Sequence, residues 1–244
     1  MSPTPVAVAV VLAAGMGTRV GADGNKAYLR VAGRSMVTWS IDTLTRVPEI
    51  ARTVLVFRRG ERELAQDTIR RELPSATVEF VEGGGTRHGS EVNVLRHLAT
   101  DIESGSVDVV VIHDAARPVA DPGMFVTALS VAREFGGAIP ALPVTDVARA
   151  GGDGALDSLG VPGGLVRVQT PQAFRAQALL GAYRAAARDG FEGTDTSSCI
   201  EAYADVEIRT FRGEQRNLKV TYARDIAVAE RLLMRREGPP VCSR

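Results

Sequence analysis

Short, unbroken apolar runs alternate with amphipathic segments along most of this chain. The first run, Val6–Leu12, contains no alternating polar residues, which predicts a strand buried on both faces. Further strands are expected at 52–57, 77–81, 107–112, 137–144 and 206–211. Helices are expected at 36–47, 61–73, 94–99, 122–134, 175–188 and 224–234, the first ended by Pro48. This alternation predicts right-handed βαβ units and an α/β fold around a mostly parallel sheet.

The loop after the first strand is the most informative stretch, reading LAAGMGTRVGADGNK over 12–26. Gly15 and Gly17 lack a Cβ, so backbone amides there could approach a polyanion, as in phosphate-binding loops. Arg19 and Lys26 add two cations to the same loop. Backbone amides flanked by fixed cations could stabilise charge on a phosphate under attack.

Three interpretations of this loop compete. It could be a glycine-rich turn without a ligand. It could belong to a dinucleotide fold, but Val20 stands where the third glycine belongs, and no acidic residue about 20 positions on closes a strand. The third interpretation is a nucleotidyltransferase. Its signature, small-small-Gly-x-Gly-x-Arg with a nearby Lys, is met by Ala13, Ala14, Gly15, Gly17, Arg19 and Lys26.

Two further loops are expected to join the first, because ligands of parallel sheets bind beyond the carboxyl ends of the strands. The loop at 82–93 carries three consecutive glycines at 83–85 and also Ser90, which could cap a helix or contact a base. The loop after strand 107–112 begins with His113 and Asp114. Asp114 could place a magnesium ion beside a triphosphate, or it could be a turn former paired with Arg117.

Composition narrows the function classes. Lys plus Arg equals Asp plus Glu at 29 each over 244 residues, so no broad charge footprint for nucleic acid or an anionic membrane is expected. The apolar runs are too short to span a bilayer, and no signal peptide is recognised, so a cytoplasmic protein is expected. Three histidines and two cysteines without metal-ligand spacing make a histidine or zinc site improbable.

Six motifs follow one another in order over nearly the whole chain. They are LAAGMGTR with Lys26, the GG…S loop, VIHDAARP, QTPQAF at 169–174, TD at 194–195 and NLKVT at 217–221. Together they resemble the 2-C-methyl-D-erythritol 4-phosphate cytidylyltransferase family, whose close relatives act on ribitol 5-phosphate. The resemblance implies one domain over 1–244, with a Rossmann-like sheet of the nucleotide-diphospho-sugar transferase type flanked by helices. It also implies that the acceptor's phosphate attacks the α-phosphorus of CTP and releases pyrophosphate, in isoprenoid precursor synthesis.

The resemblance assigns roles position by position. Arg19, Lys26 and Lys219 would be catalytic, and Asp114 would bind Mg²⁺. The nucleotide would be bound by Ala13, Ala14, Gly15, Gly17, Arg19, Lys26, Gly83, Gly84, Ser90 and Ala115. The acceptor would be bound by Asp114, Arg117, Thr170, Thr194 and Lys219. The segment at about 145–168 would be a protruding β-hairpin arm that clasps a second subunit in a homodimer, and a loose tail is expected from about 235.

Three positions depart from the family pattern. Gly85 stands where many relatives carry an acidic residue, Val147 replaces a threonine of the arm, and Pro162 stands where its arginine is expected. The last two would reach the acceptor's phosphate, so the acceptor half of the site is altered. Arg149 or Arg167 could supply the missing charge. Alternatives to the methylerythritol phosphate activity are therefore a paralogue using another polyol phosphate, such as ribitol 5-phosphate, and an inactive nucleotide-binding homologue.

Overall fold

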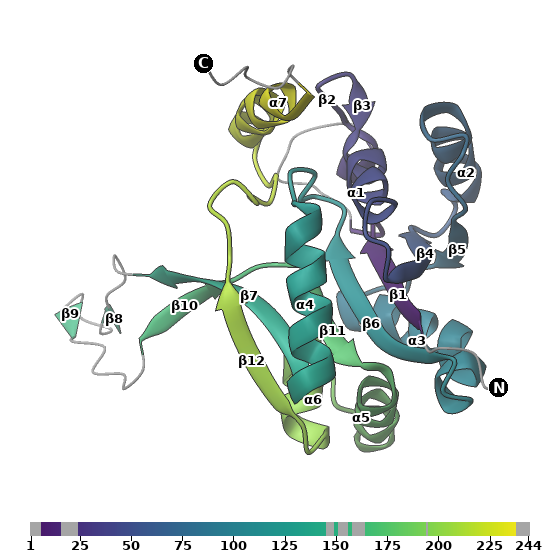
Figure 1. Cartoon of the computed structure of the whole chain (residues 1–244), viewed down its shortest axis with the longest axis vertical. Coiled ribbons are helices and arrows are strands. Elements are labelled where there is room, and N and C mark those ends of the chain that lie inside the picture. The colour runs from purple at the N-terminus through teal and green to yellow at the C-terminus, as the bar shows by residue number, and fades with distance from the viewer. Residues whose placement is uncertain are drawn as a thin grey trace.

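The computed structural model describes residues 6–15, 24–144, 149–150, 156–157, 164–193 and 195–237. Figure 1 shows a twisted central sheet with helices on both faces. The strands are β1 (Val6–Leu12), β2 (Arg30–Val31), β3 (Arg34–Ser35), β4 (Ile50–Phe57), β5 (Glu79–Glu82), β6 (Val107–Asp114), β7 (Gly136–Val144), β8 (Arg149–Ala150), β9 (Leu156–Asp157), β10 (Leu165–Val168), β11 (Gln172–Arg175) and β12 (Glu207–Arg212). The helices are η2 (Lys26–Tyr28), α1 (Met36–Leu44), α2 (Arg62–Glu72), α3 (Arg87–Glu103), α4 (Pro122–Phe135), α5 (Ala176–Asp189), α6 (Thr196–Tyr203) and α7 (Ala223–Glu237).

Within the described residues, the main sheet has eight strands in the order β10-β7-β11-β6-β1-β4-β5, with β12 paired to β7. Strands β1, β4, β5 and β6 run parallel, and β12 runs parallel to β7. Strand β11 lies antiparallel between β6 and β7, and β10 pairs antiparallel with β7. The predicted mostly parallel α/β sheet is therefore confirmed, with antiparallel insertions on the side away from β5.

Alternate residues of β1 enter two separate cores, as expected for a central strand. Ala7, Ala9 and Val11 pack in the core beneath α1, α2 and α4. Val8 and Val10 pack on the opposite face with α3, α5 and α6. A third, smaller cluster joins Trp39 of α1 to Val220 and to the C-terminal helix α7. No helix among the described residues is long and apolar enough to cross a bilayer.

Several predicted boundaries were wrong. Helix α1 ends at Leu44, before Pro48, and Ser35 stands at its N-cap position while its hydroxyl bonds Glu72 rather than the helix. Strand β11 was missed because only four residues separate the preceding loop from α5. Helix α7 continues to Glu237, past the point where a loose tail was expected.

The predicted arm is divided between two structures. Strands β8 and β9 form a small antiparallel pair that lies away from the body in Figure 1, whereas β10 is part of the main sheet. The segment 145–168 therefore combines the β8–β9 pair with a strand of the main sheet at its C-terminal end. Positions Val147 and Pro162 lie outside the described residues.

Candidate active site

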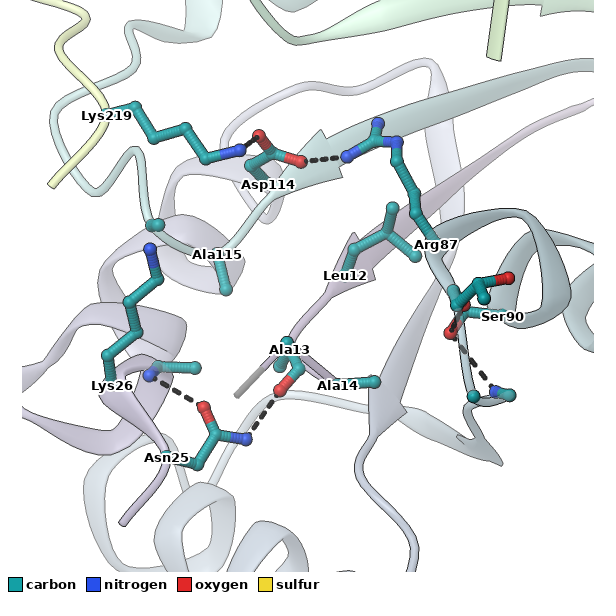
Figure 2. A pocket seen from close by; sticks show the side chains of 16 residues that line it. Leu12, Ala13, Ala14, Asn25, Lys26, Arg87, Ser90, Asp114, Ala115 and Lys219 are labelled. Carbon is teal, nitrogen blue, oxygen red and sulfur yellow. Dashed lines mark hydrogen bonds and ion pairs between the residues drawn. The ribbon is translucent and has the colours of Figure 1, made fainter. Parts of the chain in front are cut away.

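The three loops expected to meet do meet, around a cavity of about 440 Å³. Leu12 and Asp114 are the last residues of the adjacent parallel strands β1 and β6, so both loops leave the sheet at the same edge. Figure 2 shows the cavity from close by. It is lined by Leu12, Ala13, Ala14, Gly15, Asn25, Lys26, Ala27, Gly84, Gly85, Thr86, Arg87, Ser90, Asp114, Ala115, Ala116 and Lys219.

One wall of the cavity is backbone of Ala13–Gly15, Gly84 and Gly85, and the predicted site residue Gly83 adjoins it without lining the cavity. We call the stretches 13–15 and 83–85 together the glycine wall. A Cβ on Gly83 would lie 2.6 Å from the Cβ of Ala14, and a Cβ on Gly84 would lie 2.6 Å from the backbone of Gly89. These contacts leave no room for a side chain, so the two loops can approach only as glycines. A Cβ on Gly15 or Gly85 would meet nothing within 4 Å, so these two positions border open space.

Ser90 does not cap the third helix, so that prediction was wrong. Helix α3 begins earlier, at Arg87, and its N-cap is Thr86, whose side chain accepts a bond of 3.0 Å from the amide of Gly89. The buried Ser90 hydroxyl accepts from the amide of Gly84 at 3.1 Å and donates to the carbonyl of Thr86 at 2.9 Å. Ser90 therefore holds the glycine wall against the helix, and a contact to a base stays a prediction.

The opposite wall, which we call the charged wall, consists of Arg87, Asp114 and Lys219. Oδ1 of Asp114 lies 2.6 Å from Nη1 of Arg87, and Oδ2 lies 2.7 Å from Nζ of Lys219, as Figure 2 shows. Burial would raise the pKa of the Asp114 carboxyl, but the two cations outweigh burial and hold that pKa well below its usual range. Asp114 is therefore ionised at neutral pH.

Sequence reasoning missed Arg87, although its spacing from Glu91 is the i,i+4 spacing of helical ion pairs. Nε of Arg87 lies 3.1 Å from Oε1 of Glu91, which is 1% exposed. Glu91 also accepts hydrogen bonds from the hydroxyls of Thr196, at 2.7 Å, and Tyr183. Burial raises the pKa of Glu91 despite these partners. This buried cluster fastens α5 and α6 to the charged wall.

Both lysines of the chain, Lys26 and Lys219, line this cavity, whereas every other basic side chain apart from histidine is an arginine. Lys26 follows the loop after β1, and its Nζ donates to the carbonyl of Val220 at 3.1 Å. Lys219 lies in the segment after β12, almost 200 residues further along the chain. Figure 2 shows both lysines on the same side of the cavity. The fold therefore brings together the two ammonium groups that the motifs singled out.

Arg117 and Thr170 lie behind the lining rather than in it. Nη1 of Arg117 donates to the carbonyl of Asn217 at 2.7 Å, and the amide of Arg117 closes a turn onto the carbonyl of Asp114 at 3.0 Å. The turn interpretation of this loop was correct, but the Arg117 guanidinium does not pair with Asp114. The Thr170 hydroxyl accepts a 3.0 Å bond from the Asp114 amide. Both residues thus secure the backbone of the charged wall.

His113 has a structural position, with its ring fully buried. Its Nε2 faces the carbonyl of Arg117 at 3.2 Å, so this nitrogen carries the proton, because a carbonyl only accepts. Its Nδ1 then accepts from the Thr170 hydroxyl at 3.2 Å. Burial lowers the pKa of His113 to about 4, so the ring is neutral at pH 7. His113 therefore holds Thr170 in place from inside the sheet.

Three predicted site residues, Gly17, Arg19 and Thr194, lie outside the described residues. Within the part of the chain that the structure describes, no three His, Cys, Asp or Glu side chains gather to hold a metal ion. Asp114 is the carboxylate of the charged wall, and one carboxylate with substrate phosphates is a donor set that Mg²⁺ uses. Lys219 is 41% exposed and could turn away to free one oxygen. The donor set therefore fits magnesium once phosphate is present.

The fold and the cavity define a nucleotidyltransferase. At the ends of its parallel strands, the α/β sheet presents glycine-rich backbone, a carboxylate and two lysines to one cavity. The family model for 2-C-methyl-D-erythritol 4-phosphate cytidylyltransferase matches residues 7–235. The chain belongs to this family.

Known relatives agree with that assignment. The chain is 37% identical over 228 residues to a 2-C-methyl-D-erythritol 4-phosphate cytidylyltransferase of Cereibacter sphaeroides, covering 92% of this chain and 96% of the relative. It is 33% identical to one of Solibacter usitatus, covering 95% and 97%. The crystal structure of 4-diphosphocytidyl-2C-methyl-D-erythritol synthase from Anaerococcus prevotii superimposes with a TM-score of 0.80 at 27% identity, covering 94% and 96%.

Proposed function

We propose that this chain joins CTP and 2-C-methyl-D-erythritol 4-phosphate to give 4-diphosphocytidyl-2-C-methyl-D-erythritol and pyrophosphate. The observation that carries the proposal is the convergence of Lys26, Asp114 and Lys219, from three distant parts of the chain, on a cavity walled by glycine backbone. The names of the relatives support the same reaction.

The chemistry follows from charge and position. An oxygen of the acceptor's phosphate would attack the α-phosphorus in line, and no covalent enzyme intermediate is needed. Lys26, with Arg19, would stabilise the charge that builds on the α-phosphate. The Lys219 ammonium would leave its ion pair with Asp114, bind the acceptor's phosphate and hold that phosphate for attack. The glycine wall would receive the cytidine and triphosphate.

Asp114 would hold Mg²⁺ together with the phosphates of the nucleotide. The ion would neutralise negative charge on the triphosphate, which lowers the barrier to displacement of pyrophosphate. Arg87 would stay on the other carboxylate oxygen, because Glu91 anchors its guanidinium from behind.

A homodimer formed through the 145–168 arm is part of the proposal. Support comes from β10, where Leu165, Val166 and Val168 are 38–48% exposed on a strand that leads out of the arm. Sedimentation should give the mass of a dimer, and a monomer at micromolar concentration would contradict the homodimer. A cytoplasmic location also stays a prediction, which cell fractionation would check.

One assay tests the reaction and its alternatives. The protein is given CTP and Mg²⁺ with 2-C-methyl-D-erythritol 4-phosphate, ribitol 5-phosphate or related polyol phosphates, and pyrophosphate release is measured. Turnover with the first acceptor supports the proposal. Turnover only with another acceptor supports a paralogue, and CTP binding without turnover supports an inactive homologue. UTP in place of CTP is the control for base selection.

A further inference from the structure

Asn25 precedes Lys26 and has a side chain whose hydrogen-bonding groups are all engaged. It is 6% exposed and stands at the N-cap of η2. Its Oδ1 accepts from the amide of Ala27 at 3.0 Å. Its Nδ2 donates to the carbonyl of Ala13 at 2.6 Å and to Oε2 of Glu61 at 2.7 Å. An amide group has two donor hydrogens and one acceptor oxygen, so this environment suits asparagine in one orientation.

These bonds join two pieces of the site that lie 12 residues apart in the sequence. Ala13 begins the glycine wall, and its own amide is bonded to the carbonyl of Val56 in β4 at 2.9 Å. Lys26 begins η2, on the other side of the cavity in Figure 2. The Asn25 amide is a direct side-chain link between the central sheet and the backbone that carries Lys26.

Glu61 favours the same orientation of the Asn25 amide as the Ala13 carbonyl does. A carboxylate only accepts hydrogen bonds, so it fixes Nδ2 on its own side and leaves Oδ1 for the Ala27 amide. Glu61 stands at the N-cap position of α2, outside the cavity lining, and its other oxygen pairs with Nη2 of Arg58 at 2.6 Å. One of the three partners that orient Asn25 in the cavity therefore lies outside the lining.

We propose that Asn25 is a positioning residue for nucleotidyl transfer, which sets the place of the Lys26 ammonium relative to the glycine wall, and that Glu61 orients it. The inference depends on the proposed function only for its kinetic test. A catalytic cation misplaced by about 1 Å can cost up to about 10²-fold in rate, so the effect should fall on kcat.

The kinetic test uses Asn25→Asp, which keeps size and the acceptor for Ala27 but cannot donate to Ala13 and faces Glu61 with a second carboxylate. We expect kcat to fall about 10-fold or more with little change in the KM for CTP. Asn25→Asp combined with Lys26→Ala should be no slower than Lys26→Ala alone, because both act through the same ammonium. Multiplicative losses in the double variant would overturn the proposal.

Variants of Glu61 and Arg58 provide a test and its matched control. Glu61→Ala should lower kcat by a smaller factor, and Glu61→Gln, which retains an acceptor oxygen, should restore part of the loss. Arg58→Ala removes only the other partner of Glu61 and should leave kcat unchanged. If Glu61→Ala leaves kcat at the wild-type value, Glu61 has no orienting role. Thermal unfolding of each variant checks that it is folded. If Asn25→Asp does not fold, the kinetic effect of Glu61→Ala is used to test the proposal instead.

A spectroscopic test of the same proposal needs no turnover. Because the chain has two lysines, protein labelled with ¹³C-lysine gives two Cε signals, and Lys26→Arg identifies which belongs to Lys26. Asn25→Asp should shift the Lys26 signal and weaken its response to CTP, while the Lys219 signal stays in place. An unshifted Lys26 signal would overturn the inference. A shifted Lys26 signal in a protein without any transferase activity would support the inference while the proposed reaction fails.

Discussion

The glycine wall and the charged wall face the same cavity but are built in different ways. The glycine wall depends on close backbone approach, with Gly83 and Gly84 packed too tightly for any side chain. The charged wall depends on side chains from α3, β6 and the segment after β12, joined by ion pairs of 2.6 and 2.7 Å at Asp114. Both walls join segments that are distant in the chain, but the first is backbone packed closely against backbone, whereas the second is held by ion pairs between side chains.

The difference suggests that the glycine wall and the charged wall have different roles in the reaction. A backbone wall whose amides at Ala13, Gly83 and Gly84 are bonded within the protein keeps a fixed shape, which suits a ligand part that is the same in every reaction cycle. A wall of mutually neutralising charges can open, because Lys219 can leave Asp114 for a phosphate. We therefore expect substitutions in the charged wall to change catalysis and pH dependence, and substitutions in the glycine wall to change packing.

The largest effect is expected for Lys26→Ala, which removes a cation opposite the glycine wall. The rate should fall about 10²-fold or more, because charge on the transferred phosphate loses its partner. Steady-state pyrophosphate release measures this. Arg30→Ala, an exposed residue of β2 outside the cavity lining, is the control and should keep its activity. Full activity of Lys26→Ala would remove this lysine from the mechanism.

Asp114→Asn should destabilise the charged wall itself. It leaves Arg87 and Lys219 facing a neutral amide. Removing one partner of a buried ion pair should lower the free energy of unfolding by about 3 kcal/mol. This is the low end of the usual range, because Lys219 can turn to solvent. Urea unfolding at pH 7 measures this loss in the free energy of unfolding. Asp108→Asn, at the start of the same strand with Arg133 as its half-exposed partner, should cost under about 1 kcal/mol. Equal losses would contradict the buried role of Asp114.

Acid should weaken the charged wall through His113. Its folded-state pKa of about 4 lies below the ordinary histidine pKa of 6.5, so between these values the unfolded chain takes up a proton that the folded protein does not. Stability is therefore lost as pH falls from about 6.5 to about 4, by about 2 kcal/mol at pH 5. Urea unfolding in EDTA at pH 7 and pH 5 measures the slope. His113→Gln should flatten it.

The smallest effect is expected in the glycine wall. Gly83→Ala places a methyl group 2.6 Å from the Cβ of Ala14 and should cost about 1.5 kcal/mol, as for other overpacked sites. Gly85→Ala is the matched control, because its Cβ would meet nothing within 4 Å and should leave stability unchanged. Thermal unfolding compares the two. A Gly83→Ala protein as stable as Gly85→Ala would show that the two loops are not held in close contact.

The elements most readily predicted were those with a clear pattern. The apolar run Val6–Leu12 forms β1 with the bounds expected, because a strand between two helical layers has no solvent-facing side. Ser90 was misjudged because a serine near a helix start bonds backbone amides equally well from the cap or, as here, from within the first turn. Strand β11 was missed because four residues carry too little periodicity to be recognised.

The site was predicted unevenly for the same reason. Lys26, Asp114 and Lys219 were expected from ordered motifs, and the structure brings them to one cavity. Arg87 and Asn25 were not expected, because their importance comes from partners 27 and 12 positions away. A long-range hydrogen bond leaves no periodic signal in a single sequence.

By itself, the sequence determined the α/β class, the loops that border the site and the residues with chemistry to offer, because strand burial and glycine spacing are local properties. The tertiary structure alone decided which charges neutralise one another, that Arg117 and Thr170 stand behind the lining, and that Asn25 ties Lys26 to the sheet. Those relations depend on distances between segments far apart in the chain, and distances of that kind arise only when the cores on both faces of the sheet close.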